Sequence, residues 1–264
     1  MIKKIKIIIL IYNLLIILMT FVGMILVLNE LDVINVGGKN KSSTSSGGVV
    51  SAEVEEVMAM SDEDVWKGLT GGLLTSLPDS KAPSNASEIE AAVRKQIVSI
   101  TVPIRVWENS GDSSNMNTVK KEQTLEVNSL LADLWTAFFN DIYNEASDFV
   151  IVSVGCFRID GTGYGQIGFK SAHTYGAAVD INAYDDGNPY GSMAPYSKSE
   201  WSSLPENHLK YQIIYTDSKV VEIAHKYTLL WGGDWSGGTY DLMHFSFIAD
   251  GSSRAERQQQ FGNK

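Results

Sequence analysis

The apolar run near the N-terminus most constrains what this chain can fold into. Three lysines within residues 1–6 precede residues 7–28, which are almost entirely apolar. As an α-helix this run would be about 33 Å long, enough to cross the hydrocarbon core of a bilayer. A cleaved signal peptide has a shorter apolar region and a small-residue cleavage site, which ILVLNELDV does not offer. A buried core helix is disfavoured because the run has no polar face.

We therefore expect residues 7–28 to be an uncleaved transmembrane signal anchor. The lysines of residues 1–6 would remain in the cytoplasm, because positive charge favours that side of the membrane. The rest of the chain would then lie on the extracytoplasmic side of the cell membrane, as part of a single-pass protein. Membrane contact is expected only through this N-terminal helix.

Composition divides the remaining chain. The stretch VGGKNKSSTSSGG is typical of a flexible tether, so we expect a linker over residues 29–50. We expect an acidic helical lead-in over 51–98, one main domain over 99–250 and a polar tail over 251–264. A chain of 264 residues allows one full-sized domain but not two large ones. The net charge of −10 disfavours a nucleic-acid partner, since phosphate binding requires clustered Lys and Arg.

Capping patterns predict two helices in the lead-in. Ser61 followed by Asp64 indicates a helix start, and Gly71 indicates the end of that helix. Ser87 with Glu90 indicates the start of a second, short helix across IEAAVRKQI. The lead-in is therefore expected to be helical.

The main domain mixes strands and helices without regular alternation. ITVPIRVW and TVKKEQTLEV are typical of strands, and Pro103 places the first at a sheet edge. We expect Asn128 to cap a helix over SLLADLWTAFFNDIYNEA, whose apolar residues recur at helical spacing. FVIVSVG is predicted to be a buried strand, VVEIAHKY a helix behind Asp217, and MHFSF a final strand. Because no nucleotide-binding glycine motif follows a strand, we predict an α+β fold.

Three residues with reactive side chains are predicted to carry no chemistry. Cys156 is the only cysteine, so no internal disulfide can form. Because it follows an apolar run, it is expected to be a small buried side chain rather than a nucleophile. His208 and His225 are interpreted as ordinary exposed or helix-face histidines.

A candidate metal site begins with His173 and Asp180 in the segment SAHTYGAAVDIN. Strand alternation places Asp180 and His244 away from their apolar neighbours, so both can share one exposed sheet face. Gly176 permits a turn that returns the His173 ring toward the strand. Two imidazoles and one carboxylate form a ligand set of the catalytic zinc type, with a fourth position open. We expect His173, Asp180 and His244 to bind one zinc ion.

Asp241 is a candidate general base. It precedes His244 by three residues, in the turn leading into the last strand, where its carboxylate could take a proton from a water molecule at the metal. Each spacing alone is common in unrelated proteins. The combination of the two motifs carries the prediction.

Several segments together resemble a known family. SAHTYGAAVDIN, NPY, WGGDW and DLMHF are similar to peptidoglycan metallopeptidases that include D-alanyl-D-alanine carboxypeptidases and L-alanyl-D-glutamate endopeptidases. The likeness covers roughly residues 101–248, with the segments in the family's order. It implies a small α+β domain with an antiparallel sheet flanked by helices, related in fold to hedgehog signalling domains.

The resemblance also implies roles for particular residues. It makes His173, Asp180 and His244 the zinc ligands and Asp241 the base. It makes Arg158, in GCFRIDG, similar to the family arginine that steadies a substrate carbonyl or carboxylate. The residues that match family positions shaping the substrate site are Ser171, Asp234 and Trp235.

The chain departs from the family pattern at two positions. Relatives often have Glu where Ser246 stands and Gly where Thr228 stands. Asp rather than Glu at position 241 resembles the endopeptidase branch.

Three functions are compatible with these features. The first is a zinc peptidase that cuts peptidoglycan stem peptides outside a bacterial membrane. The second is a zinc-containing binding or signalling module without activity, which the intact Asp241 disfavours. The third is a membrane-tethered structural protein. We expect the first, with peptidoglycan stem peptides as partners and with the oligomeric state left open.

Overall fold

The computed structural model describes residues 50–108, 117–159, 168–183, 197–201, 214–235 and 240–248. The predicted anchor over 7–28 and the predicted tail over 251–264 lie outside the described residues, as does nearly all of the linker. Every described residue belongs to one unit, Gly47–Lys264. Across the described ranges, no helix is both long enough and apolar enough to span a bilayer.

The elements follow one another in a mixed order. In chain order they are α2 (Ala52–Ala59), α3 (Asp62–Thr70), α4 (Ala86–Gln96), β1 (Ile97–Trp107), β2 (Thr118–Asn128), η1 (Ser129–Leu131), α5 (Ala132–Glu145), β3 (Val154–Gly155), η2 (Gly168–Lys170), η3 (Ala172–Tyr175), β4 (Ala178–Ile181), α6 (Lys198–Trp201), α8 (Lys219–Lys226), β5 (Leu230–Gly232) and β6 (Asp241–Ser246).

Local capping explains where the lead-in helices begin and end. The Ser61 hydroxyl accepts a hydrogen bond from the Asp64 amide at 3.2 Å, and Gly71 ends α3 in the left-handed conformation at φ +61°. Both boundaries confirm the sequence prediction. The predicted start of the second helix at Ser87 is wrong, because the Asn85 carbonyl already accepts the amide of Ile89. The N-cap of α4 is therefore Asn85, two residues before the predicted cap, and the helix begins at Ala86.

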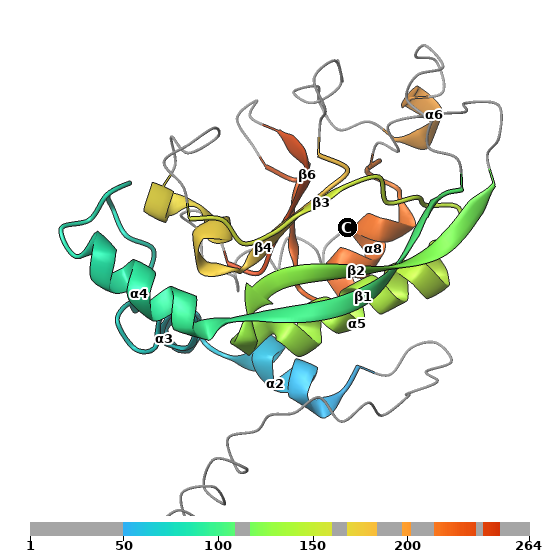
Figure 1. Ribbon diagram of the computed structural model, residues 1–264. Coiled ribbons are helices and arrows are strands. Elements are labelled where there is room, and N and C mark those ends of the chain that lie inside the picture. Colours follow the sequence, from blue (N-terminus) through green and yellow to red (C-terminus); the bar gives the residue numbers. More distant parts are fainter. Residues whose placement is uncertain are drawn as a thin grey trace, which may run out of the picture. The chain divides into compact units, whose positions relative to one another are not determined.

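The strands β1 and β2 form a long antiparallel hairpin, as predicted. The pairing runs from Ile97 opposite Asn128 to Trp107 opposite Thr118 without a shift of register. Among the described residues this sheet has two strands, so Pro103 lies in an edge strand there, as predicted. The helix α5 packs along the hairpin (Figure 1).

Asn128 joins the hairpin to α5. Its side-chain oxygen accepts the amide of Leu130 at 3.1 Å and so starts the short turn η1, after which α5 continues. The capping role predicted for Asn128 is confirmed. The apolar face of α5 is buried through residues that include Trp135, Phe138 and Ile142.

A second, four-stranded antiparallel sheet has the order β3-β4-β6-β5. The prediction of a full strand over FVIVSVG is wrong in length, because β3 contains only Val154 and Gly155. The preceding backbone bonds elsewhere: the Ile151 amide donates to the Arg105 carbonyl, and the Val152 amide to the Asn182 side chain. The helix α8 follows Asp217 as expected and is capped by Ser218.

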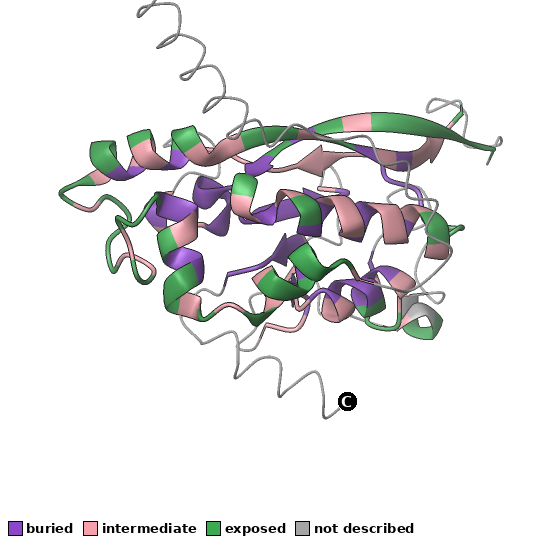
Figure 2. Ribbon diagram, turned by 90° about the horizontal axis from the view of Figure 1, so that it is seen from below, coloured by how far each residue is buried: buried purple, intermediate pink, exposed green. Residues whose placement is uncertain are grey.

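The core lies between the hairpin, α5 and the second sheet. Buried residues concentrate on the faces that these elements turn toward one another (Figure 2). The ring of Phe138 on α5 lies 5.7 Å from the ring of Phe245 on β6, centroid to centroid. The described part is thus α+β with small antiparallel sheets, as the sequence predicted.

Candidate metal centre

Strand pairing brings the first two predicted ligands together. Asp180 on β4 stands directly opposite His244 on β6, so the two residues share one face of the sheet, as alternation along both strands predicted. The expectation that they share an exposed face is wrong, since Asp180 is 2% exposed and His244 is 6% exposed. His173 covers this face, and the ring of Trp235 lies 5.4 Å from that of His244.

The third predicted ligand comes from a single turn of 3₁₀ helix. His173 lies in η3, which Gly176 ends at φ +63°, a conformation that glycine adopts without strain. The turn directs the His173 ring back toward β4, as predicted. The Nδ1 atom of His173 lies 2.8 Å from the Cys156 carbonyl, which can only accept a hydrogen bond. The proton therefore lies on Nδ1, and Nε2 presents a lone pair.

Three donor atoms converge at this point. Asp180 Oδ1 lies 3.0 Å from His173 Nε2 and 3.1 Å from His244 Nδ1, and the two nitrogens are 3.2 Å apart. No arrangement of protons satisfies all three edges of this triangle. Tetrahedral zinc with bonds of about 2.0 to 2.1 Å separates neighbouring ligand atoms by about 3.3 to 3.4 Å. The triangle is close to that size, so the three side chains fit a metal ion.

Asp180 is held in its ionised form. Burial would raise the pKa of its carboxyl, but the neighbouring imidazoles of His173 and His244 outweigh burial and hold the pKa well below its usual range. The Nη1 atom of Arg158 donates to the second carboxylate oxygen, Oδ2, at 3.0 Å. A metal ligand must be deprotonated, and these contacts favour that state.

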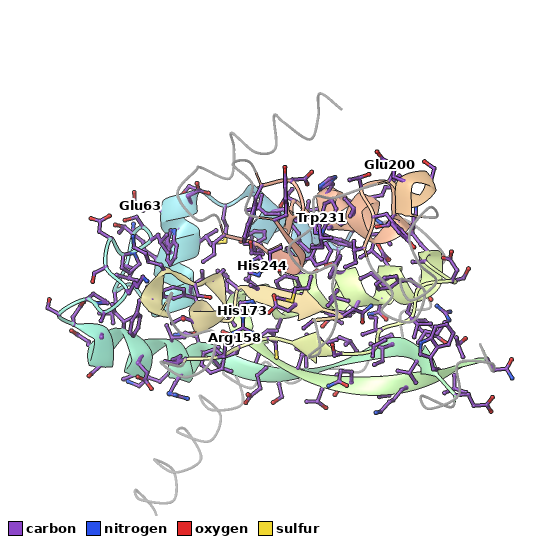
Figure 3. The ribbon with its side chains drawn as sticks, turned by 90° about the horizontal axis from the view of Figure 1, so that it is seen from above. Glu63, Arg158, His173, Glu200, Trp231 and His244 are labelled. Carbon is purple, nitrogen blue, oxygen red and sulfur yellow. The ribbon has the colours of Figure 1, made fainter. Side chains whose placement is uncertain are left out.

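Arg158 contacts Asp180, one of the three predicted metal ligands. Its guanidinium bonds Asp180 Oδ2 and leaves Oδ1 to the two histidines, while 37% of the side chain stays exposed. Figure 3 shows Arg158, His173 and His244 close together, with Glu63 and Glu200 far out at opposite ends of the view. No feature of the sequence indicated that Arg158 and Asp180 would pair.

Asp241 lies at the start of β6, opposite Gly232 of β5. A Cβ at Gly232 would run into the backbone carbonyl of Asp241, so only glycine allows this close approach. Oδ1 of Asp241 is buried and has no hydrogen-bond partner within the described ranges. Burial raises the pKa of the Asp241 carboxyl, although the attraction of His244 opposes the rise.

The three predicted substrate residues occupy different settings. Ser171 precedes η3, and Trp235 packs on the ring of His244. Asp234 Oδ2 lies 2.9 Å from Nε2 of His225 on α8. The partnership between His225 and Asp234 was missed, because nothing in a helix-face histidine indicates which distant turn it will meet.

Residues 165–247 match a protein-family model described as D-alanyl-D-alanine carboxypeptidase. The matched range contains His173, Asp180, Asp241 and His244, and it confirms the family resemblance read from the sequence motifs. Arg158 lies outside it. Comparisons with curated proteins and with solved structures gave no match.

Proposed function

We propose that this chain is a zinc-dependent peptidase that hydrolyses peptide bonds in the stem peptides of bacterial peptidoglycan. The bond would be of the L-alanyl-D-glutamate or the D-alanyl-D-alanine type. The observation that carries the proposal is the triangle of donor atoms from His173, Asp180 and His244, inside the segment that matches a peptidase family. Peptidoglycan is the substrate that this family suggests.

His173, Asp180 and His244 would hold one zinc ion. Imidazole nitrogen and carboxylate oxygen are ligands that zinc accepts, and three protein ligands are typical of catalytic rather than structural zinc sites. When bound, zinc polarises a carbonyl group and lowers the pKa of a water molecule toward about 7.

The carboxyls of Asp180 and Asp241 have environments that favour different roles. The neighbouring histidines lower the pKa of Asp180, whereas burial raises the pKa of Asp241. A pair of acids whose pKa values are driven apart in this way is typical of sites that divide charge stabilisation from proton transfer. We assign Asp180 as a ligand and Asp241 as the base that takes a proton from the attacking water and passes it to the leaving amine.

Arg158 would serve two groups. Its bond to Asp180 fixes the orientation of that ligand. The guanidinium has five N–H donors, and the side chain is more than one-third exposed, so further donors are available to a substrate carbonyl or carboxylate. Ser171, Asp234 and Trp235 would shape the substrate site around it.

The experiment is incubation of the zinc-loaded full chain with purified muropeptides, followed by mass analysis of the products. Loss of a terminal D-alanine would identify a carboxypeptidase, and cleavage after L-alanine an endopeptidase. A chain that retains zinc and cleaves neither bond would contradict the proposal and favour a zinc-containing binding module.

The proposal includes the membrane anchor over residues 7–28, with the main domain outside the cell. We expect the full-length chain in membrane fractions, with the main domain accessible to protease added to intact cells after wall removal. Full accessibility follows because only residues 1–6 would remain inside. A shortened protein in the medium, with a new terminus near residues 29–38, would instead indicate a cleaved signal peptide.

A further inference from the structure

We propose that Trp66 and Asn128, together with the backbone at Lys81, are positioning residues for His173. The lead-in segment is, from this point, the part of the lead-in from α3 to α4, residues 62–96, and the His173 turn is residues 168–176. The proposal assigns the lead-in segment a part in metal binding, and it rests on the metal site of the proposed function. Three separate contacts carry it.

The first contact is the buried side chain of Asn128. Its Nδ2 atom donates to the Leu69 carbonyl of α3 at 3.0 Å and to the Tyr175 carbonyl at 3.1 Å. Its own backbone amide donates to the Gly176 carbonyl at 3.0 Å. Asn128 is 0% exposed, so water cannot replace these bonds. One residue thus joins the last turn of α3 to the His173 turn.

The second contact is aromatic. The ring of Trp66 on α3 meets the ring of Tyr175 edge to face, with centroids 4.9 Å apart and planes at 85°. The Tyr175 hydroxyl donates to the Phe169 carbonyl at 2.8 Å, so the same side chain also ties the two ends of the His173 turn together. Tyr175 is fully buried and lies two residues after the ligand.

The third contact joins backbone to backbone. The Phe169 amide donates to the carbonyl of Lys81 at 3.0 Å. Lys81 lies in the loop between α3 and α4. Gly168 adopts φ +53°, and a Cβ there would run into the same carbonyl. The loop that follows α3 therefore lies directly against the start of the His173 turn.

These contacts matter because the His173 turn has little regular structure of its own. Its two 3₁₀ segments, η2 and η3, contain three and four residues, and such short turns are weakly stable alone. The imidazole has one bond outside the donor triangle, to the Cys156 carbonyl. The orientation of Nε2 therefore depends on what packs behind the turn, and the lead-in segment supplies much of that packing.

The test measures zinc affinity of the full chain by competition with a chromophoric chelator. In Asn128→Ser the shorter hydroxyl can still accept from Leu130 but cannot reach both carbonyls. Trp66→Leu removes the ring contact, and Trp66→Phe retains part of it. Val54→Ala is the control, because α2 packs on α5 and its side chain is as buried as that of Asn128.

We expect Asn128→Ser and Trp66→Leu to weaken zinc binding about tenfold, a loss typical of residues that orient metal ligands. Trp66→Phe should recover part of the affinity. Val54→Ala should destabilise the fold yet bind zinc within about twofold of the parent. If the variants at Asn128 and Trp66 lose thermal stability as Val54→Ala does but bind zinc like the parent, these two residues are merely structural and the proposal is wrong.

Hydrogen exchange of the metal-free parent provides a second measurement. It requires no zinc, and it does not depend on whether the variants fold. The amides of Phe169 and Gly176 should exchange in step with those of α3, because the segments would open together. Exchange of the turn while α3 stays protected would contradict the coupling, even if Asn128→Ser fails to fold. Failure of the parent to bind zinc would instead contradict the proposed function.

Discussion

The hairpin region, made of β1, β2 and α5, and the metal-site region, made of residues 168–183 and 230–248, are built on different principles. The first has two eleven-residue strands and a fourteen-residue helix with a continuous apolar face. The second has strands of four, three and six residues, and two short 3₁₀ turns precede the first of these strands. The buried polar residues follow the same division, since all but Thr70 and Asn128 lie in the metal-site region.

The difference indicates where stability and function reside. Apolar burial of about 25 cal/mol per Å² stabilises the hairpin region, whereas each buried polar group of the metal-site region must find a partner or cost free energy. In the donor triangle, the lone pairs of the metal-free cluster face one another. Apart from Asn128, which bonds the His173 turn, substitutions in the hairpin region should therefore change folding, and substitutions in the metal-site region should change chemistry.

The largest effect is expected from removing two ligands. In His173→Ala/His244→Ala the chain should lose stoichiometric zinc and all peptidase activity, because one carboxylate cannot hold the ion. Metal content by atomic emission, measured after dialysis, checks this. His225→Ala is the matched control and should keep its zinc, because its contact is with Asp234. Zinc retained by the double variant would refute the ligand assignment.

Asp241→Asn should separate chemistry from metal binding. The amide keeps the size of the side chain but cannot accept a proton, so kcat should fall by about 10²- to 10⁴-fold. Zinc content should be unchanged. Since burial disfavours the charged carboxylate, the substitution should not lower the Tm of the metal-free chain. Near-normal turnover with zinc bound would reduce Asp241 to a supporting role.

Phe138→Ala tests the hairpin region. The ring is 0% exposed and contacts Trp135, Phe139, Tyr227 and Phe245. Its removal should lower the free energy of unfolding by about 3 to 5 kcal/mol. Denaturant titration measures the loss, and zinc content should remain at one ion while the chain is folded. A variant that keeps its stability but loses zinc would contradict the division between the two regions.

The smallest effect is expected at the junction of the two regions. Thr228 follows α8 at φ +56°, a left-handed conformation that is strained for a β-branched residue. Its hydroxyl is also buried without a hydrogen-bond partner in the part of the chain that the structure describes. Thr228→Gly should raise the free energy of unfolding by about 1 kcal/mol, measured by thermal denaturation. Unchanged or lower stability would show that the Thr228 methyl contributes more packing than the strain costs.

The sequence predicted the features that depend on local periodicity or capping. Alternation along two strands was enough to place Asp180 and His244 each on the face away from their apolar neighbours, and single residues such as Ser61 and Asn128 marked helix starts. Relatives often have glycine where this chain has Thr228, and the backbone at Thr228 has the positive φ that favours glycine. Each of these features depends on residues that are close together in the sequence.

The failures involve segments whose partners are distant in sequence. FVIVSVG has the composition of a strand, but its backbone bonds Arg105 and the Asn182 side chain instead of a continuous ladder. The pairing of Arg158 with Asp180 and the contact of Cys156 with His173 arise from that same irregular segment. Burial of the donor triangle was missed because it depends on what packs over β4, which alternation does not specify.

The wide spacing of the predicted ligands along the chain has a consequence for its stability before the metal arrives. His173 and His244 are 71 residues apart, so one ion bound to both would close a long loop of a chain that has a single cysteine. By the chain-entropy estimate for cross-links, closing such a loop lowers the conformational entropy of the unfolded chain and so stabilises the fold by about 4 kcal/mol. On the proposed extracytoplasmic side, the ion would then stabilise the domain as disulfides stabilise secreted domains. Until the metal arrives, such a chain would remain a better target for proteases.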